Sequence, residues 1–335
     1  MNIIKNLSLA FLSIFLTLII LEFFLRIVGH VPFDYRNTNS PYPSIYQQDH
    51  ITGWSNKEGS FVVKMDEGNI VKYNILKDGS RYSGYSPSNK TPKNKIILIG
   101  GSFTLGQAIN DDETFAYNMQ KKLKNYEIKN YGSGGFGTYQ SYLKLKQIYN
   151  KFNDIDYVLY FFVDLHEARN IGDASWLEFL SKLAREPVKV PYAKLDNSKE
   201  LVEYPPLRYI VIPFSNHSVL ISKIQKKLIR LKLFSKQDEK KIITKKIILK
   251  INELSKSKDS NFIMINLLSS ASNINDYKKF ALENGIKFIN CQVELNDQRT
   301  VKNEGHPNGL ANKKYSNCIL KNVFNNWEKE IVKDR

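Results

Sequence analysis

A serine and a histidine near opposite ends of the C-terminal two thirds of the chain could act together in nucleophilic catalysis. Ser102 lies in LIGGSFTLGQ (98–107), directly after an apolar run. A serine hydroxyl is a poor nucleophile unless a base takes its proton, and histidine is the usual base because its pKa lies near neutrality. His306, one of five histidines, lies in the polar turn KNEGHPNGLANKKYS. The two residues predict nucleophilic catalysis, provided that the fold brings them together.

The glycines around Ser102 have a competing interpretation as a phosphate-binding loop. The segment GGSFTLG lacks the Walker lysine and the G-x-G-x-x-G spacing, so nucleotide binding is disfavoured. Zinc is equally disfavoured, because the two cysteines, Cys291 and Cys318, form no C-x-x-C or Cys/His cluster. We therefore expect neither a metal nor a cofactor. Both cysteines lie in apolar contexts that favour buried thiols, and the alternative is a disulfide if the domain is extracytoplasmic.

Alternating apolar and amphipathic segments from residue 95 onward predict an α/β domain with a parallel sheet. The expected strands are 95–100, 126–130, 156–163, 261–268 and 286–290. The expected helices are 111–123, 138–152, 237–257, 274–285 and 309–327. Ser102 then follows the first strand, at the carboxyl edge where open parallel sheets bind ligands.

The N-terminus predicts a membrane anchor. Residues 7–21 carry no charge, and the apolar stretch continues to Gly29, which is long enough to cross a bilayer. A cleaved signal peptide is the alternative, but RIVGHVPF is a poor cleavage sequence. We expect an anchor at 1–29, a membrane-proximal segment with short strands at 30–94, and the main domain at 95–335. The N-terminus would lie in the cytoplasm and the body outside it, in the periplasm or another extracytoplasmic space.

Residues 170–235 interrupt the strand–helix alternation, and we expect an insertion there with short helices of its own. It could be a lid over the site or a packing domain. The basic stretch 223–250 reads as helical with a solvated lysine face, and binding of an anionic polymer or lipid is the alternative. The net charge of +16 reflects lysine spread along the whole chain, so no nucleic-acid partner is expected.

Four segments in order resemble the sequence blocks of SGNH/GDSL hydrolases. They are GGSFTLGQ with DDETF, NYGSGGFGTYQ (130–140), YFFVDLHEARN (160–170) and NEGHPNGLANKKY (303–315). The upstream ITGW (51–54) and NILKDGSRY (74–82) resemble the corresponding region of membrane-anchored bacterial members. The resemblance implies a flavodoxin-like three-layer α/β/α fold and hydrolysis or transfer of an acyl ester.

The resemblance also implies roles for individual residues. Ser102 would be the nucleophile and His306 the base, and the backbone N–H groups of Ser102 and Gly135 would bind the oxyanion. Gly101 stands where the family has an aspartate. Asp164 stands at the position of the oxyanion-binding asparagine, although a carboxylate cannot donate unless protonated; Asn170 or His166 are possible substitutes. Asn303 stands at the position of the catalytic aspartate, so either Glu304 or a backbone carbonyl would orient His306.

The sequence therefore predicts a membrane-anchored serine esterase or O-acyl transferase. Its expected substrate is an acylated cell-envelope glycan or a lipid-linked intermediate. Two alternatives stay open: a non-catalytic glycan-binding or assembly protein on the same fold, which Asp164 and Asn303 favour, and a lipase or thioesterase.

Overall fold

The computed structural model describes residues 2–33, 43–65, 68–85, 94–183, 189–209, 211–233 and 237–324. These residues form two compact units. The first comprises the N-terminus to Thr38 with Asp173–Val188 and Arg208–Phe234, and the second comprises the rest of the chain. The fold of each unit is described separately.

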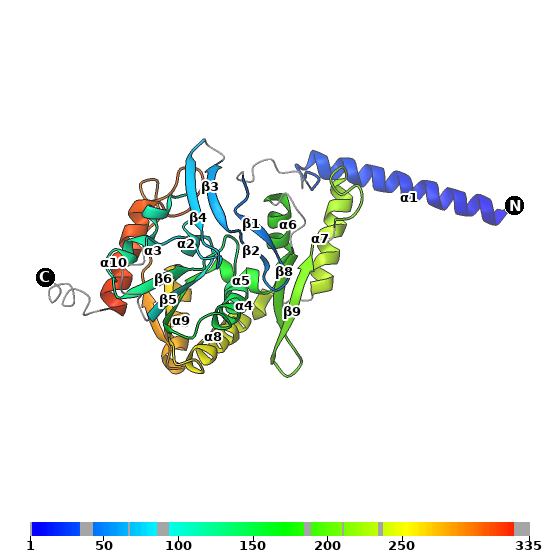
Figure 1. Cartoon of the computed structure of the whole chain (residues 1–335). Coiled ribbons are helices and arrows are strands. Elements are labelled where there is room, and N and C mark those ends of the chain that lie inside the picture. Colours follow the sequence, from blue (N-terminus) through cyan, green and yellow to red (C-terminus); the bar gives the residue numbers. More distant parts are fainter. Residues whose placement is uncertain are drawn as a thin grey trace. The chain divides into compact units, whose positions relative to one another are not determined.

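A five-stranded parallel sheet forms the centre of the second unit (Figure 1). Its strands are β5 (Asn94–Gly100), β6 (Tyr126–Asn130), β7 (Ile155–Val163), β10 (Asn261–Leu268) and β11 (Lys287–Asn290). They lie in the order β11-β10-β7-β5-β6, and every pairing is parallel. This is the flavodoxin-like order, in which the chain reverses its direction of winding beside the first strand. The residues after β5 therefore lie at the switch point of the sheet.

Helices cover both faces of this sheet. Alternate residues of β5 point to opposite faces, so Ile97 and Ile99 pack into one core while Ile96 and Leu98 pack into the other. The first core is closed by α4 (Thr138–Tyr149), α8 (Lys240–Lys256) and α9 (Ala271–Glu283), and the second by α3 (Phe115–Gln120) and α10 (Gly309–Val323). The predicted three-layer fold is confirmed.

Two predicted helices begin with a short separate turn. The segment expected as one helix at 111–123 divides into a 3-10 turn, η1 (Asp111–Glu113), and α3, because Thr114 is extended and caps the second helix through Tyr117 N. The segment expected at 237–257 likewise begins with η2 (Gln237–Glu239) before α8. Of the helix expected at 309–327, residues 325–327 lie outside the described part of the chain.

Two antiparallel hairpins precede the sheet in the second unit. β1 (Tyr46–Asp49) pairs with β2 (Gly53–Asn56), and β3 (Gly59–Lys64) pairs with β4 (Ile70–Ile75). Apolar residues of the second hairpin, including Val63 and Tyr73, pack on Leu105 and Ala108 just after the serine. The second hairpin, which precedes the sheet in the sequence, therefore packs against the segment that follows Ser102.

The segment expected as an insertion contains a hairpin besides short helices. It contains α6 (Ala174–Leu183) and α7 (Val219–Leu233), which belong to the first unit, but also the hairpin β8 (Lys189–Leu195) and β9 (Leu201–Arg208) of the second unit. A turn closes the hairpin, in which Asp196 N donates to Glu200 O and Lys199 takes a positive φ. Prolines 191, 205 and 206 interrupt the strand pattern, which is why the alternation is hard to read.

The first unit contains α1 (Asn2–Ile27), drawn in Figure 1 as one unbroken helix. Ile3–Ile27 is long and apolar enough to cross a membrane, and none of its most apolar stretch is buried in protein. A membrane anchor and a signal sequence both have these properties. The structure therefore gives a candidate span.

The favoured interpretation of the cysteines as buried thiols is wrong. Cys291, directly after β11, and Cys318, in α10, form a disulfide with their Cα atoms 5.7 Å apart. The two residues come together because β11 and α10 are neighbours on one side of the sheet, a proximity that their separate apolar contexts in the sequence do not reveal.

Candidate active site

Ser102 is the first residue of a four-residue helix, α2 (Ser102–Leu105), that begins one residue after β5 ends. Two glycines make this turn possible. Gly100 has φ +155, and a Cβ there would lie 2.2 Å from the Thr104 hydroxyl. Gly106 ends the helix in the left-handed region. The sharp turn leaves Ser102 half-buried at the carboxyl edge of the central strand.

His306 reaches the same edge from the turn between β11 and α10. Its Nε2 lies 3.0 Å from Ser102 Oγ, within hydrogen-bond distance. The imidazole packs edge-on against the ring of Phe103. The backbone of the turn is fixed because Val301 N donates to His306 O, and Val301 packs into the cluster that contains Leu105.

The two acid candidates next to His306 are placed differently. Glu304 Oε2 lies 3.4 Å from His306 Nδ1. The distance fits an ion pair, but Nδ1 is buried and makes no well-aligned hydrogen bond. Catalytic hydrogen bonds are often long in an unliganded site, so the 3.4 Å separation is compatible with a pairing of Glu304 and His306. Asn303 is exposed and has φ +57, so the turn places its side chain in solvent.

Gly135 lies in the loop between β6 and α4, and part of this loop packs on α2. A Cβ at the neighbouring Gly132 would lie 2.3 Å from Leu105 N, so the loop packs directly on the serine helix. Trp54 Nε1 donates to Gly134 O, and Asn56 Nδ2 donates to Gly132 O. These contacts show what the ITGW segment does: the hairpin β1–β2 holds the loop whose N–H groups are the expected oxyanion donors.

Asp164 follows β7 at the same edge of the sheet. Its Oδ2 accepts a hydrogen bond from Ser270 N at the start of α9, and its Oδ1 is buried without a hydrogen-bond partner. The carboxylate therefore links two sheet-edge loops as an acceptor. Asn170, one possible substitute donor, is fully used elsewhere: its amide group bonds Tyr139 N, Thr138 and Thr244.

His166, the other possible substitute, lies behind the nucleophile turn. Its Nδ1 pairs with Tyr160 Oη at 2.8 Å, and burial holds its pKa well below the usual range. A Cβ at Gly101 would lie 2.9 Å from His166 Nε2 and 3.2 Å from Arg169 Nη1. Arg169 donates to Phe136 O, and burial lowers its pKa to about 10. These two side chains occupy the place that an aspartate before Ser102 would need, which explains the glycine.

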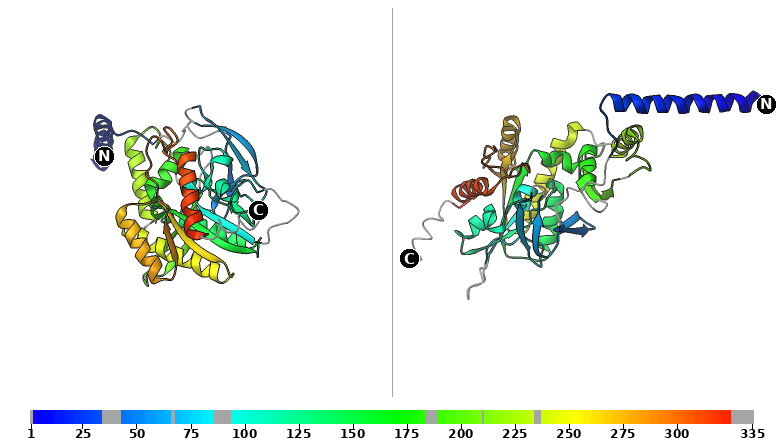
Figure 2. Two further views of the ribbon diagram at one scale, coloured as in Figure 1. Left: turned by 90° about the vertical axis from the view of Figure 1, so that its left-hand side faces the viewer. Right: turned by 90° about the horizontal axis from the view of Figure 1, so that it is seen from above.

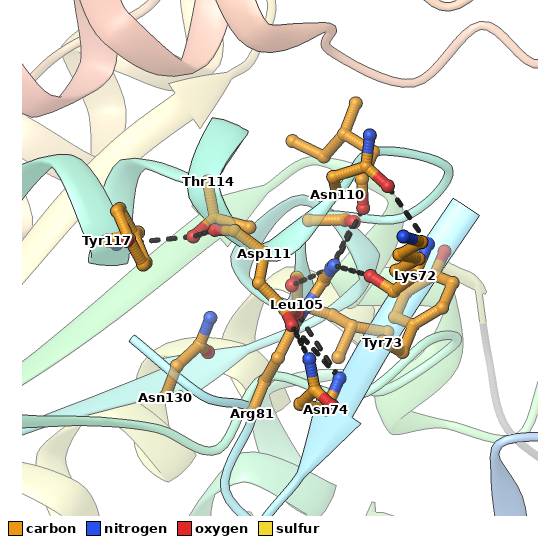
Figure 3. A network of polar contacts seen from close by, with 12 residues as sticks. Lys72, Tyr73, Asn74, Arg81, Leu105, Asn110, Asp111, Thr114, Tyr117 and Asn130 are labelled. Atoms are coloured by element: carbon orange, nitrogen blue, oxygen red, sulfur yellow. Dashed lines mark hydrogen bonds and ion pairs between the residues drawn. The ribbon is translucent and has the colours of Figure 1, made fainter. Parts of the chain in front are cut away.

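A buried arginine fixes the far end of the serine helix (Figure 3). Arg81 is fully buried, and its Nε pairs with Asp111 at 2.6 Å. Its guanidinium also donates to four backbone oxygens, those of Lys72, Leu105, Gly106 and Ile109. Asn74 donates to the same Asp111 carboxylate.

Sequence reasoning assigned no role to Arg81, Trp54 or Arg169. All three stand in segments that carried part of the family resemblance, Arg81 in NILKDGSRY, Trp54 in ITGW and Arg169 in YFFVDLHEARN, and that was the available signal.

The arrangement can support proton transfer between a serine and an imidazole with a carboxylate beyond it. With its hydrogen on Nδ1, toward the Glu304 carboxylate, the imidazole would have Nε2 free to accept the Ser102 proton. The N–H groups in the first turn of α2 have no partner within the helix, because the first turn of any helix lacks carbonyls to receive them. A negative oxygen beside Ser102 would therefore find donors already in place.

No protein-family model and no curated protein matches this chain. Among solved structures, TesA is similar to it with a TM-score of 0.40 and 8% identity, over 69% of this chain and 98% of that one. A lipolytic G-D-S-L family protein from Veillonella parvula is similar with a TM-score of 0.38 and 13% identity, over 68% of this chain and 96% of that one. The psychrotrophic esterase EstA from Pseudoalteromonas is similar with a TM-score of 0.40 and 8% identity, over 69% of this chain and 97% of that one. One of these solved proteins, that from Veillonella parvula, is described as a member of the G-D-S-L family, which the four sequence blocks of this chain resemble.

Proposed function

We propose that this chain is a serine hydrolase that cleaves an ester through an acyl-enzyme. The observation that supports this most directly is the 3.0 Å distance between Ser102 Oγ and His306 Nε2. The Glu304 carboxylate on the opposite side of the imidazole and the open N–H groups at the start of α2 are consistent with it.

In the proposed reaction, His306 Nε2 takes the proton of Ser102 as its Oγ attacks the ester carbonyl. The carbonyl electron pair moves onto oxygen, where the N–H groups of Ser102 and Gly135 stabilise it. When the tetrahedral intermediate collapses, the C–O bond to the alcohol breaks and His306 returns its proton to the leaving oxygen. Water then repeats the sequence on the acyl-Ser102, giving a carboxylic acid and the free serine.

The proposed setting is the outer side of a membrane. The apolar helix α1 would serve as a single-pass anchor, and the Cys291–Cys318 disulfide favours an oxidising compartment. An enzyme held there meets acylated envelope glycans and lipid-linked intermediates, and a sugar hydroxyl could replace water as the acceptor. We therefore propose such an O-acylated compound as the substrate.

Asp164 favours a second candidate, a non-catalytic binding protein on the same fold. Its carboxylate occupies the position of an oxyanion donor but acts as an acceptor toward Ser270. Loss of one such donor costs about 10²–10³ in rate in hydrolases generally, so the site would be weakened.

Labelling with a fluorophosphonate separates the two candidates, because the reagent bonds only to an activated serine. We expect the full-length protein in detergent to be labelled and the variants Ser102→Ala and His306→Ala to be unlabelled. Ser257→Ala removes an exposed hydroxyl at the end of α8 and should label like the wild type. Equal labelling of wild type and Ser102→Ala, or none of either, would leave the binding protein as the better account.

A further inference from the structure

The helix α7 is attached by its N-terminus to the candidate membrane helix α1. Both oxygens of the Glu22 carboxylate accept hydrogen bonds from the start of α7: from Ser218 Oγ, Val219 N and Leu220 N, all at 2.9 Å. A carboxylate at a helix N-terminus satisfies orphan N–H groups and complements the helix dipole. Arg26, one turn further along α1, pairs with Glu22 and donates to His217 O.

This attachment determines how α7 lies relative to a membrane. Figures 1 and 2 show that α7 runs across the axis of α1 rather than along it. In Figure 1 α6 lies on one side of α7, while α1 extends away on the other side. If α1 spans a bilayer, α7 lies along the surface of that bilayer, and the side of α7 opposite α6 faces the lipid.

The two sides of α7 have different side chains. Toward α6, Val219 and Ile229 are buried, Gln225 bonds Tyr209 Oη, and Lys226 pairs with Glu178 of α6. At helical spacing on the opposite side lies an apolar stripe, whose members are each about half exposed: Ile224 (46%), Leu228 (50%) and Leu231 (48%).

A surface helix of a water-soluble domain usually presents polar residues on the side away from its core. Here that side is apolar along the i, i+4, i+7 positions, and the exposed Lys223 and Lys227 run along one flank of the stripe. An apolar stripe flanked by lysines is the pattern of a helix that lies in the membrane interface and meets anionic headgroups.

We infer that α7 is a membrane-surface helix, which inserts Ile224, Leu228 and Leu231 into the interface of the bilayer that α1 spans. The ligand is the phospholipid surface itself, with Lys223 and Lys227 contacting anionic headgroups. The inference rests on the proposed membrane anchor and does not depend on esterase activity.

Quenching by doxyl-labelled lipid tests this with the full-length chain reconstituted in vesicles of phosphatidylcholine and phosphatidylglycerol. An environment-sensitive dye is attached to Leu228→Cys and, in separate protein, to Leu16→Cys in α1, and the same vesicles without doxyl-labelled lipid give the unquenched emission. We expect lipid quenching to remove most of the emission at both positions. Replacing phosphatidylglycerol by neutral lipid should weaken quenching at 228 and not at 16.

An unquenched dye at 228 overturns the inference whatever happens at 16, and the dye at 16 tells whether the anchor has failed as well. Efficient Leu228→Cys cross-linking between two chains, without lipid quenching, would also overturn it, because a second copy would then cover the stripe. The variant Ile224→Ser/Leu228→Ser/Leu231→Ser leaves the side facing α6 intact and should keep its fluorophosphonate labelling. With a dye on Lys227→Cys, lipid quenching should fall in this variant relative to the same label in the wild-type background.

Discussion

Glu304 Oε2 lies 3.4 Å from His306 Nδ1, whereas the side chain of the adjacent Asn303 is exposed to solvent. The difference follows from the backbone, because Asn303 and Gly305 both take left-handed conformations and direct the residue between them toward the imidazole. The carboxylate beside the imidazole is therefore displaced by one residue from Asn303, the position at which the family resemblance puts the acid.

The first prediction concerns this displaced acid. Glu304→Gln should lower kcat for a chromogenic ester by about 10²-fold or more, because an amide neither stabilises the imidazolium nor fixes its tautomer. Asn303→Ala serves as the matched control and should have little effect. A silent Glu304→Gln combined with a gain from Asn303→Asp would instead identify a serine–histidine dyad.

The second prediction concerns Arg81, which holds the end of the serine helix and pairs with Asp111. Arg81→Met leaves a buried carboxylate and several carbonyls without a partner, so the free energy of unfolding should fall by about 3–5 kcal/mol. Denaturation in detergent, followed by tryptophan fluorescence, measures it. Lys199→Met breaks an ion pair whose lysine is 64% exposed, and should change stability by less than about 1 kcal/mol. A similar loss of unfolding free energy in both variants would show that the Arg81 network stabilises the fold no more than an exposed ion pair does.

The third prediction concerns the glycine before the nucleophile. Gly101→Asp restores the residue type that the family has, but its side chain would collide with His166, Arg169 and the Phe136 carbonyl. We expect a lower melting temperature and loss of fluorophosphonate labelling. Gly309→Ala is the control, because a Cβ there meets only the Glu113 side chain. Faster labelling of Gly101→Asp than of the wild type would contradict this account.

The fourth prediction is a dependence of stability on acid. Burial acts to raise the pKa of Asp78, but hydrogen bonds from Lys129 and Ser80 outweigh it and lower that pKa to about 2. A folded-state pKa below the unfolded value of 3.8 stabilises the fold above about pH 4, and this contribution is lost as the pH falls toward 2. The shift corresponds to about 2 kcal/mol.

Asp78→Asn should therefore be less stable than the wild type at neutral pH. Between about pH 4 and 2 its free energy of unfolding should fall by less than that of the wild type. Asp297→Asn, at an exposed position, should keep the wild-type profile. Parallel acid profiles for Asp78→Asn and the wild type would show that this carboxylate does not determine the acid sensitivity.

The sequence predicted an element best where the pattern of apolar residues directly reflects the burial of that element. The run KIILIG is apolar on both faces because β5 is covered on both faces, so periodicity was sufficient to place it and to place Ser102 after it. The hairpin β8–β9 was missed because its prolines disguise the alternation. The packing of His166 and Arg169 against Gly101 could not be predicted either. It depends on the segments after β5, β6 and β7 meeting in space. The choice between Glu304 and Asn303 depends on two backbone angles that no pattern of residue types specifies.

The disulfide has a consequence for when the segment that carries His306 becomes covalently constrained. Cys291 and Cys318 lie before and after the turn that carries this residue, so their bond closes residues 291–318 into a covalent ring that contains the proposed base. Ser102 lies outside this ring. A newly made chain with reduced cysteines must hold its histidine segment by packing alone, and the ring closes only on oxidation. If the domain is exported, the ring closes only after arrival, so the segment that carries His306 gains its covalent constraint outside the cytoplasm.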